Sequence, residues 1–217
     1  MKVYGVRECF YTLQGEGGNA GRAAVFLRFN ACNLWSGRAQ HRERDAIRNR
    51  AACPMWCDTD FAGGSRLTLD ALLETIAAAR RHPCELLVAT GGEPLLQLDA
   101  ALVAEVHRMG MAVAIETNGT IEAVPAGVDW VCVSPKRRVD EVRLRHGDEL
   151  KVVFPAYHPL DYAELAPRFA QLYVSPEAPP APVAFTITSN MAAAARFCME
   201  HPPWRLSIQA HKILSLP

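Results

Sequence analysis

Three of the seven cysteines in this 217-residue chain lie around one polar segment. Twenty residues separate Cys32 from Cys53, three separate Cys53 from Cys57, and Asp-Thr-Asp follows at once. Cysteines grouped in this way bind metals more often than they form disulfides when the compartment is reducing. A tetrahedral zinc ion needs four ligands, or three and an open position, whereas three thiolates on a [4Fe–4S] cluster leave one iron free. The trio alone leaves the cluster level with the alternatives, which are a zinc site or incidental thiols.

The other four cysteines have no comparable setting. Each lies in an apolar stretch, where an isolated cysteine behaves as a small buried hydrophobic side chain. An odd total of seven also fits a framework of disulfides poorly. We therefore assign no chemistry to the remaining cysteines, which are Cys9, Cys84, Cys132 and Cys198.

Polar residues recur where apolar, strand-like segments end. They occur in TGGE (90–93), ETNG (116–119), SPK (134–136), SPE (175–177) and QAHK (209–212). The segments alternate with helical patterns, which predicts an α/β fold with a mostly parallel sheet covered on its outer side. The carboxyl ends of parallel strands form the site in α/β barrels, so we expect these residues to surround one site. The strands are too few for eight full units, which favours an incomplete (β/α) barrel.

Hydrophobic periodicity places the elements that must carry these residues. Strands are predicted over 23–31, 84–92, 111–119, 128–136, 149–155, 171–176 and 204–211. Helices are predicted over 67–82, 98–110, 161–169 and 189–201. The whole chain, 1–217, is predicted to be one domain with a cluster-binding insertion at about 32–60. Inside the insertion the arginine-rich stretch 38–50 favours a short solvated helix, and the prolines of 179–182 predict a stiff connection.

Charge and hydropathy exclude several classes of partner. Lys plus Arg and Asp plus Glu each number 23, so the formal net charge is zero, which provides no basic footprint for nucleic acid or anionic lipid. No apolar run is long enough to cross a bilayer, and the N-terminus lacks the apolar core of a secretory signal. We therefore expect a cytoplasmic protein without nucleic-acid or membrane partners.

The chain resembles the 7-carboxy-7-deazaguanine synthases, a family within the radical S-adenosylmethionine (SAM) superfamily. The resemblance rests on TLQGEG (12–17), VFLRFNACNLW (25–35), CDTDF (57–61), TGGEPLLQ (90–97), ETNGT (116–120), VSPK (133–136) and IQAHK (208–212). The cysteine gaps depart from the common superfamily pattern, although members of this family are known to tolerate an enlarged first gap. The resemblance implies that Cys32, Cys53 and Cys57 hold a [4Fe–4S] cluster.

The resemblance also implies sites for SAM and for Mg²⁺. SAM would contact the strand ends through Gly92, Glu93, Glu116, Ser134 and Lys136. The two glycines of TGGE let a ligand approach the backbone, and the carboxylate that follows them can receive an ammonium group. Thr59 would give its hydroxyl to Mg²⁺, a cation that prefers oxygen ligands, with Asp58 beside it. An ordinary turn is the alternative at each place.

The implied substrate is 6-carboxy-5,6,7,8-tetrahydropterin, which carries a carboxylate and a flat donor–acceptor edge. The arginine inside the apolar strand FLRFN is unusual, and the guanidinium of Arg28 matches a carboxylate bidentately. A strand with one face in solvent is the alternative. The other substrate contacts that the resemblance implies are Leu13, Gln14, Gly15, Glu16, Thr90, His211 and Pro217, with the terminal carboxylate of Pro217 near the site.

The implied reaction is a ring contraction in queuosine and 7-deazapurine biosynthesis. A SAM-derived radical takes hydrogen from the pterin, the ring rearranges to 7-carboxy-7-deazaguanine, and ammonia is lost, which makes the enzyme a carbon–nitrogen lyase. The resemblance also implies a homodimer. For the arginine-rich stretch, docking of an acidic, flavodoxin-type electron donor is a second hypothesis beside the solvated helix. The rivals are another radical SAM enzyme, such as a glycyl-radical activase, and a zinc-binding module without catalysis.

Overall fold

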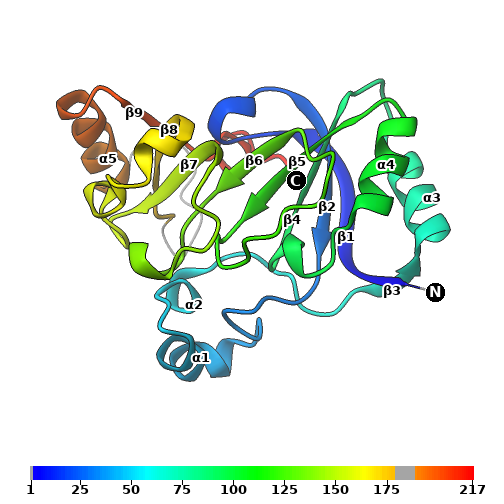
Figure 1. The fold of residues 1–217 in the computed structure, drawn as a ribbon, viewed down its shortest axis with the longest axis horizontal. Helices are drawn as coiled ribbons and strands as arrows, with labels where there is room; N and C mark the ends of the chain where they lie inside the picture. The colour runs from blue at the N-terminus through cyan, green and yellow to red at the C-terminus, as the bar shows by residue number, and fades with distance from the viewer. Residues whose placement is uncertain (1, 179–188) are drawn as a thin grey trace.

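The structure is a computed structural model that describes residues 2–178 and 189–217. Within them, nine strands form one sheet in the order β3–β1–β2–β4–β5–β6–β7–β8–β9 (Figure 1). The strands are β1 (Val3–Leu13), β2 (Ala23–Phe29), β3 (Ser65–Thr68), β4 (Leu86–Gly91), β5 (Ala112–Thr117), β6 (Trp130–Val133), β7 (Gly147–Phe154), β8 (Phe169–Pro176) and β9 (Trp204–Leu206). The α-helices are α1 (Arg42–Asn49), α2 (Cys53–Trp56), α3 (Leu69–Ala79), α4 (Ala100–Arg108), α5 (Ser189–Glu200) and α6 (Ala210–Ile213).

The pairing confirms a mostly parallel sheet. Every neighbouring pair from β2 to β9 is parallel, and β1 runs antiparallel to β2 and to β3. β3 and β9 form the two free edges, so the barrel is incomplete, as predicted. Parallel neighbours bring their carboxyl ends to one side of the sheet, where a site can be assembled from several strands.

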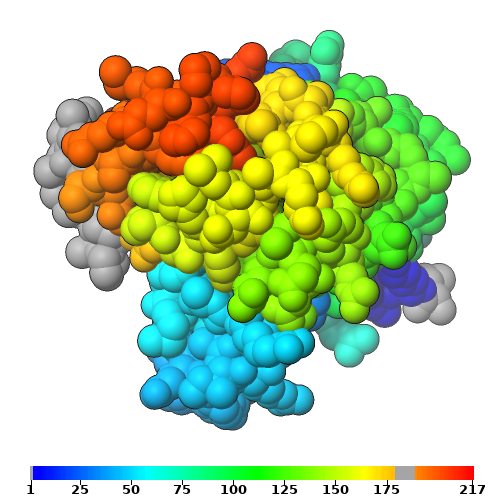
Figure 2. Space-filling model, turned by 60° about the vertical axis from the view of Figure 1, so that its left-hand side comes forward, coloured from blue at the N-terminus to red at the C-terminus, as the bar shows by residue number. Residues whose placement is uncertain are grey.

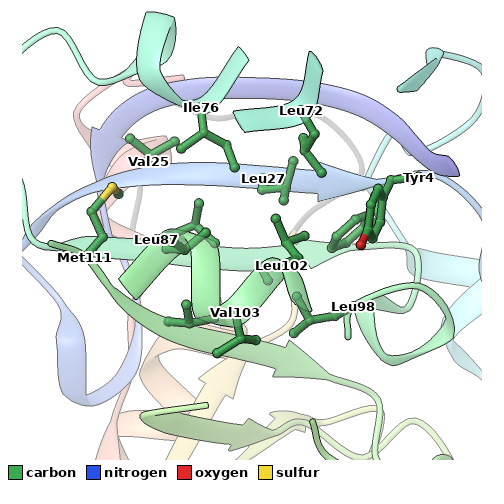
Figure 3. Close-up of a cluster of buried hydrophobic side chains, with 14 of the residues drawn as sticks. Tyr4, Val25, Leu27, Leu72, Ile76, Leu87, Leu98, Leu102, Val103 and Met111 are labelled. Carbon is green, nitrogen blue, oxygen red and sulfur yellow. The ribbon is translucent and has the colours of Figure 1, made fainter. Parts of the chain in front are cut away.

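Alternation along the strands gives the sheet an apolar outer face and a more polar inner face. On β2, Leu27 and Phe29 are fully buried in the core that α3 and α4 cover, and Figure 3 shows Leu27 below Leu72 and Ile76 of α3. Arg28, between them, points to the opposite face. β7 behaves in the same way, because its alternate apolar residues enter a second outer core beside α5 while the residues between them face inward.

Three of the predicted elements differ clearly from the structure, and strands β1 and β3 were not predicted. The strand predicted over 128–136 is only four residues long. The segment 161–169 was expected to be a helix, but it forms only two short 3-10 turns, Pro159–Tyr162 and Ala166–Arg168. Pro167 explains this, since proline lacks the amide hydrogen and clashes with the preceding turn of an α-helix. The last strand is shorter than the predicted 204–211, because it pairs with β8 only as far as Leu206 and is followed by α6. The predicted connection at 179–182 lies outside the described residues.

The segment between β2 and β3 carries α1 and α2 and projects from the rest of the molecule. Figure 2 shows it as the knob at the bottom, and Figure 1 shows both helices beyond the end of the sheet. The expected short helix in the arginine-rich stretch is α1. In the part of the chain that the structure describes, no helix is both long and apolar enough to span a membrane.

Candidate active site

The inner face of the sheet lines a cavity of about 380 Å³, a volume typical of small-molecule sites. Of the predicted site residues, all but Gly15 and Glu93 lie on its wall. Those on the wall are Leu13, Gln14, Glu16, Arg28, Cys32, Cys53, Cys57, Thr59, Thr90, Gly92, Glu116, Ser134, Lys136, His211 and Pro217. Residues from both ends of the chain, the insertion and the strand ends therefore meet at one place.

The three clustered thiols lie on this wall and are largely shielded from solvent. Burial raises the pKa of Cys32 to about 11 and that of Cys53 to about 12. Within residues 2–178 and 189–217, no three His, Cys, Asp or Glu side chains converge closely enough to bind a single metal ion. Thiolates on a four-iron cluster bind different irons and stand further apart than the ligands of one ion. All three thiols line the same cavity, as the ligands of one shared cluster must.

Two residues that sequence reasoning did not identify hold the cysteine segment in place. The hydroxyl of Tyr157 accepts the amide of Ala52 at 3.0 Å and donates to the carbonyl of Lys136 at 2.6 Å, which ties α2 to the loop after β6. Arg42 donates to the carbonyls of Pro54 and Cys57, the latter at 2.9 Å. These contacts fix the backbone that presents the second and third thiols.

The Thr-Gly-Gly turn after β4 packs directly against the first cysteine. A Cβ on Gly92 would lie 1.9 Å from the carbonyl oxygen of Ala31 and 2.9 Å from the amide nitrogen of Cys32. Glu93 is fully buried and is not among the residues that line the cavity; its carboxylate accepts hydrogen bonds from the hydroxyl of Thr117 and from the amides of Leu95 and Asn118. Glu93 therefore holds the turn onto β5, and Gly92 faces the cavity.

The ends of β5 and β6 supply polar groups on the neighbouring part of the wall. Lys136 donates to the hydroxyl of Ser134 at 2.6 Å and lies over the ring of Trp56 at 5.4 Å from its centroid. Burial lowers the pKa of Lys136. Glu116 accepts a hydrogen bond from the side-chain amide of Gln14 at 3.1 Å.

A lysine that the sequence prediction omitted joins the two glutamates of the wall. Nζ of Lys151 lies 2.9 Å from Oε2 of Glu16 and 2.9 Å from Oε2 of Glu116. Gln209 donates to the other oxygen of Glu16 at 2.9 Å. Burial alone raises the pKa of Glu16, but Lys151 and Gln209 outweigh it and lower that pKa to about 2. Glu16 is thus an anion at neutral pH.

Arg28 faces the cavity, as expected, and not solvent. Its Nε donates to Glu8 at 2.6 Å, and its guanidinium lies 6.0 Å from the ring centroid of Phe10. Within the described residues, Nε is the only guanidinium nitrogen of Arg28 that forms a hydrogen bond, and its partner carboxylate is half-exposed. This position favours a ligand-binding interpretation of Arg28 over a strand face in solvent.

The C-terminal segment closes the cavity over the loop after β1. The amide of Ala210 donates to the carbonyl of Gly15 at 3.0 Å, and a Cβ on Gly15 would collide with His211, which explains why glycine stands there. Burial lowers the pKa of His211. Lys212, in the C-terminal segment, forms an ion pair with Asp58. The neighbouring Thr59 is neutral and lines the cavity.

The wall also carries polar atoms that no described residue satisfies. Thr12 Oγ1 and the indole nitrogens of Trp35 and Trp56 are buried and have no hydrogen-bond partner among the described residues, although each of these side chains lines the cavity. A buried polar group without a partner costs free energy of about 1–3 kcal/mol. Such orphaned groups, beside three shielded thiols, fit a wall built around a bound polar molecule and a thiolate-ligated cluster.

No model of a known protein family matches the chain. Individual relatives match it over nearly its whole length. The 7-carboxy-7-deazaguanine synthase of Caulobacter vibrioides is 47% identical over 223 residues, which cover 99% of this chain and 100% of the relative. That of Bordetella pertussis is 48% identical over 225 residues, with coverage of 99% and 100%. The crystal structure of QueE from Escherichia coli is similar in fold, with a TM-score of 0.68, 24% identity and coverage of 96% and 95%.

Proposed function

The chain belongs to the family of 7-carboxy-7-deazaguanine synthases, radical SAM lyases that use a [4Fe–4S] cluster, and we propose how its own residues perform that reaction. The proposed substrate is 6-carboxy-5,6,7,8-tetrahydropterin and the proposed product 7-carboxy-7-deazaguanine, with ammonia released. One observation carries the assignment of residues: the three clustered thiols, Arg28 and the anionic Glu16 share one cavity. Neither rival, the glycyl-radical activase or the zinc module, is among the names of the relatives quoted above.

Cys32, Cys53 and Cys57 would hold the cluster, and the residues of the strand ends would hold SAM. When bound together, these two groups supply the radical that begins the reaction. Gly92 would let SAM approach the backbone, with Glu93 holding the turn from behind. Glu116 would accept the ribose hydroxyls of SAM, and Ser134 and Lys136 would contact its polar atoms.

The other half of the wall would bind the pterin. Arg28 would receive the substrate carboxylate, because only its Nε forms a hydrogen bond within the described residues and its charge is only partly balanced by a half-exposed acid. Glu16 is an acceptor for N–H groups of the pterin edge, since Lys151 keeps it ionised. The contacts proposed for the rest of the ring are Leu13, Gln14, Gly15, Thr90, His211 and Pro217.

Mg²⁺ is the third proposed cofactor, and Thr59 is its proposed protein ligand. Thr59 lines the cavity and carries no ion pair among the described residues, whereas Asp58 is bound by Lys212 and Asp60 by Arg7 at 2.5 Å. A hard cation with one protein oxygen would complete its shell with water and with oxygens of the substrate.

Replacing Arg28 with methionine should lower kcat/KM for the pterin by about 100-fold, because the substrate carboxylate loses a charged partner inside a shielded cavity. Arg28→Lys keeps the charge but loses the fork, so its loss should be about 10-fold. Stability should hardly change, because the ion pair with half-exposed Glu8 contributes little. Steady-state kinetics and thermal unfolding measure both effects.

The matched control is Arg66→Met, which removes an arginine from β3 outside the cavity. It should leave kcat/KM unchanged. An Arg28→Met enzyme that binds and turns over the pterin as well as the wild type would remove the carboxylate assignment.

We also propose a flavodoxin-type electron donor, with the insertion as its docking surface. Two large apolar side chains, Ile47 and Met55, are 73% and 56% exposed there, next to the segment that carries Cys53. Exposed arginines surround them, which suits an acidic donor. Arg42 is a poor choice for testing this, because it supports the carbonyl groups of the cysteine segment. Arg38 and Arg48 lie in the same stretch and are better placed for a test.

Reversing charge at both positions, Arg38→Glu with Arg48→Glu, should slow flavodoxin-driven turnover about 10-fold at low salt and leave dithionite-driven turnover unchanged. Arg168→Glu, an exposed arginine near β8, is the control and should affect neither. Equal slowing with both reductants would show that the substitutions damage the site and would contradict the docking surface.

A homodimer and a cytoplasmic location complete the proposal. The homodimer rests on the family resemblance. The location is supported by the chemistry of the thiols, because cysteines that ligate a cluster must stay reduced, and the cytoplasm keeps them so.

A further inference from the structure

Lys151 is a deeply buried cation on the wall of the cavity, and the fold places it at the boundary between the two proposed subsites. Only 4% of the residue is exposed. It comes from the middle of β7, where Leu150 and Val152 on either side enter the outer core. The strand therefore forces the lysine inward, and its single nitrogen meets Glu16 from one subsite and Glu116 from the other at 2.9 Å each.

Both glutamates depend on this one cation. Because their oxygens bind the same nitrogen, the two carboxylates lie within two hydrogen-bond lengths of each other. Two carboxylates this close, with side chains only 17% and 20% exposed, repel each other, and a shared positive charge is what allows both to stay ionised. The other titratable groups that face the trio are Glu149 on β7, Cys132 on β6, Lys136 after β6 and His211 on α6. Glu149 is engaged elsewhere, since it accepts the amide of Gly18 at 2.9 Å.

Stability alone is a weak reason for this arrangement. Placing charges in a protein interior costs desolvation free energy, and well-packed apolar residues of similar volume are often at least as stabilising. Both glutamates line the cavity, and Gln14 and Gln209 fix the orientation of their carboxylates. The network is therefore arranged to present two oriented anions to ligands.

We propose that Lys151 is a positioning residue that holds Glu16 and Glu116 as a pair of anions, so that one can bind the pterin and the other SAM. The assignment of the two subsites rests on the proposed function. The role of Lys151 itself rests on its two ion pairs and its burial. Without the lysine, the two carboxylates would share a proton or move apart, and both ligands would lose an acceptor.

Charge-balanced variants test this role. Anaerobically reconstituted holoenzyme is titrated with SAM and, separately, with 6-carboxytetrahydropterin in a calorimeter, without reductant. Lys151→Met should weaken the binding of SAM and of the pterin by about 10-fold or more. Each ligand would lose its hydrogen bond to an ionised, correctly oriented glutamate. In the double variant Lys151→Met with Glu116→Gln, the two carboxylates no longer repel each other. Its affinity for the pterin should lie within about twofold of that of the Glu116→Gln single variant. In the same way, the double variant Lys151→Met with Glu16→Gln should bind SAM as tightly as the Glu16→Gln single variant does.

The controls separate this role from simple packing. Lys2→Met, a surface lysine that pairs with Asp99, should change neither affinity. If Lys151→Met fails to fold, the two charge-balanced double variants should fold, and their unfolding midpoints replace the affinities as the readout. Unchanged affinities in Lys151→Met, or double variants that recover nothing, would overturn the inference. A wild-type holoenzyme that does not bind the pterin, or a Glu16→Gln variant that binds it normally, would instead overturn the proposed substrate site.

Discussion

Replacement of Cys53 with alanine is expected to abolish product formation while leaving a folded protein. The thiol is one of three that would hold the cluster, and these three are the only cysteines among the described residues that line the cavity. Removing a small buried side chain costs only about 1 kcal/mol of folding free energy, so the loss should be specific to the cluster. Iron and sulfide content per chain, SAM cleavage and product formation should fall together.

Cys198→Ala is the matched control for this variant. That cysteine is partly buried on α5, outside the cavity, and should be dispensable for iron content and for turnover. If Cys53→Ala kept a full cluster and normal turnover, the ligand set would have to lie elsewhere despite the position of the three thiols.

The second large effect is expected from Gly92→Ala. The added Cβ would lie 1.9 Å from the carbonyl oxygen of Ala31, and backbone atoms cannot move aside as a flexible side chain can. Either the turn after β4 or the segment of Cys32 must shift, at a cost of about 1–3 kcal/mol. We expect a lower unfolding midpoint and at least about 10-fold weaker SAM binding, because the shifted turn faces the SAM subsite.

Gly21→Ala gives the comparison for Gly92→Ala. That glycine has φ +85°, but a Cβ added to it would meet no atom of the described residues within 4 Å, so alanine adds backbone strain without a collision. It should lower stability and leave SAM binding intact. Equal SAM affinities for the two variants would mean that the turn after β4 does not form part of the SAM subsite.

The sequence predicted the parallel strands of the sheet and most of the wall, because one physical signal indicates both; it missed the antiparallel strands β1 and β3. Apolar strands that end in polar residues indicate a parallel sheet, and its carboxyl ends must lie together. Arg28 stood out because an arginine between apolar neighbours is unexpected in a buried strand. Lys151 carries the same signal in ELKVVF, with apolar residues on both sides, so the argument used for Arg28 was sufficient to find it.

Other parts of the site depend on tertiary contacts that no local pattern contains. Glu93 follows β4 and Glu116 lies at the end of β5, so the sequence treats them alike. The carboxylate of Glu93 accepts hydrogen bonds from the amides of Leu95 and Asn118, whereas Glu116 lines the cavity. Tyr157 supports the cysteine segment from a position far along the chain, which no local pattern reveals. Arg42 supports it from within a polar stretch, where an arginine is normally expected to be solvated. The helix expected over 161–169 failed for a local reason that was visible, the proline at 167.

The central claim is that this chain contracts the pterin ring by radical SAM chemistry in the cavity described above. Its most direct test is one anaerobic assay: the protein reconstituted with iron and sulfide receives SAM, Mg²⁺, dithionite and 6-carboxytetrahydropterin, and the products are identified by mass. We expect 7-carboxy-7-deazaguanine from the wild type and none from Cys53→Ala. A reconstituted protein that cleaves SAM but leaves the pterin unchanged would contradict the substrate, and a protein that takes up zinc and forms no cluster would contradict the chemistry altogether.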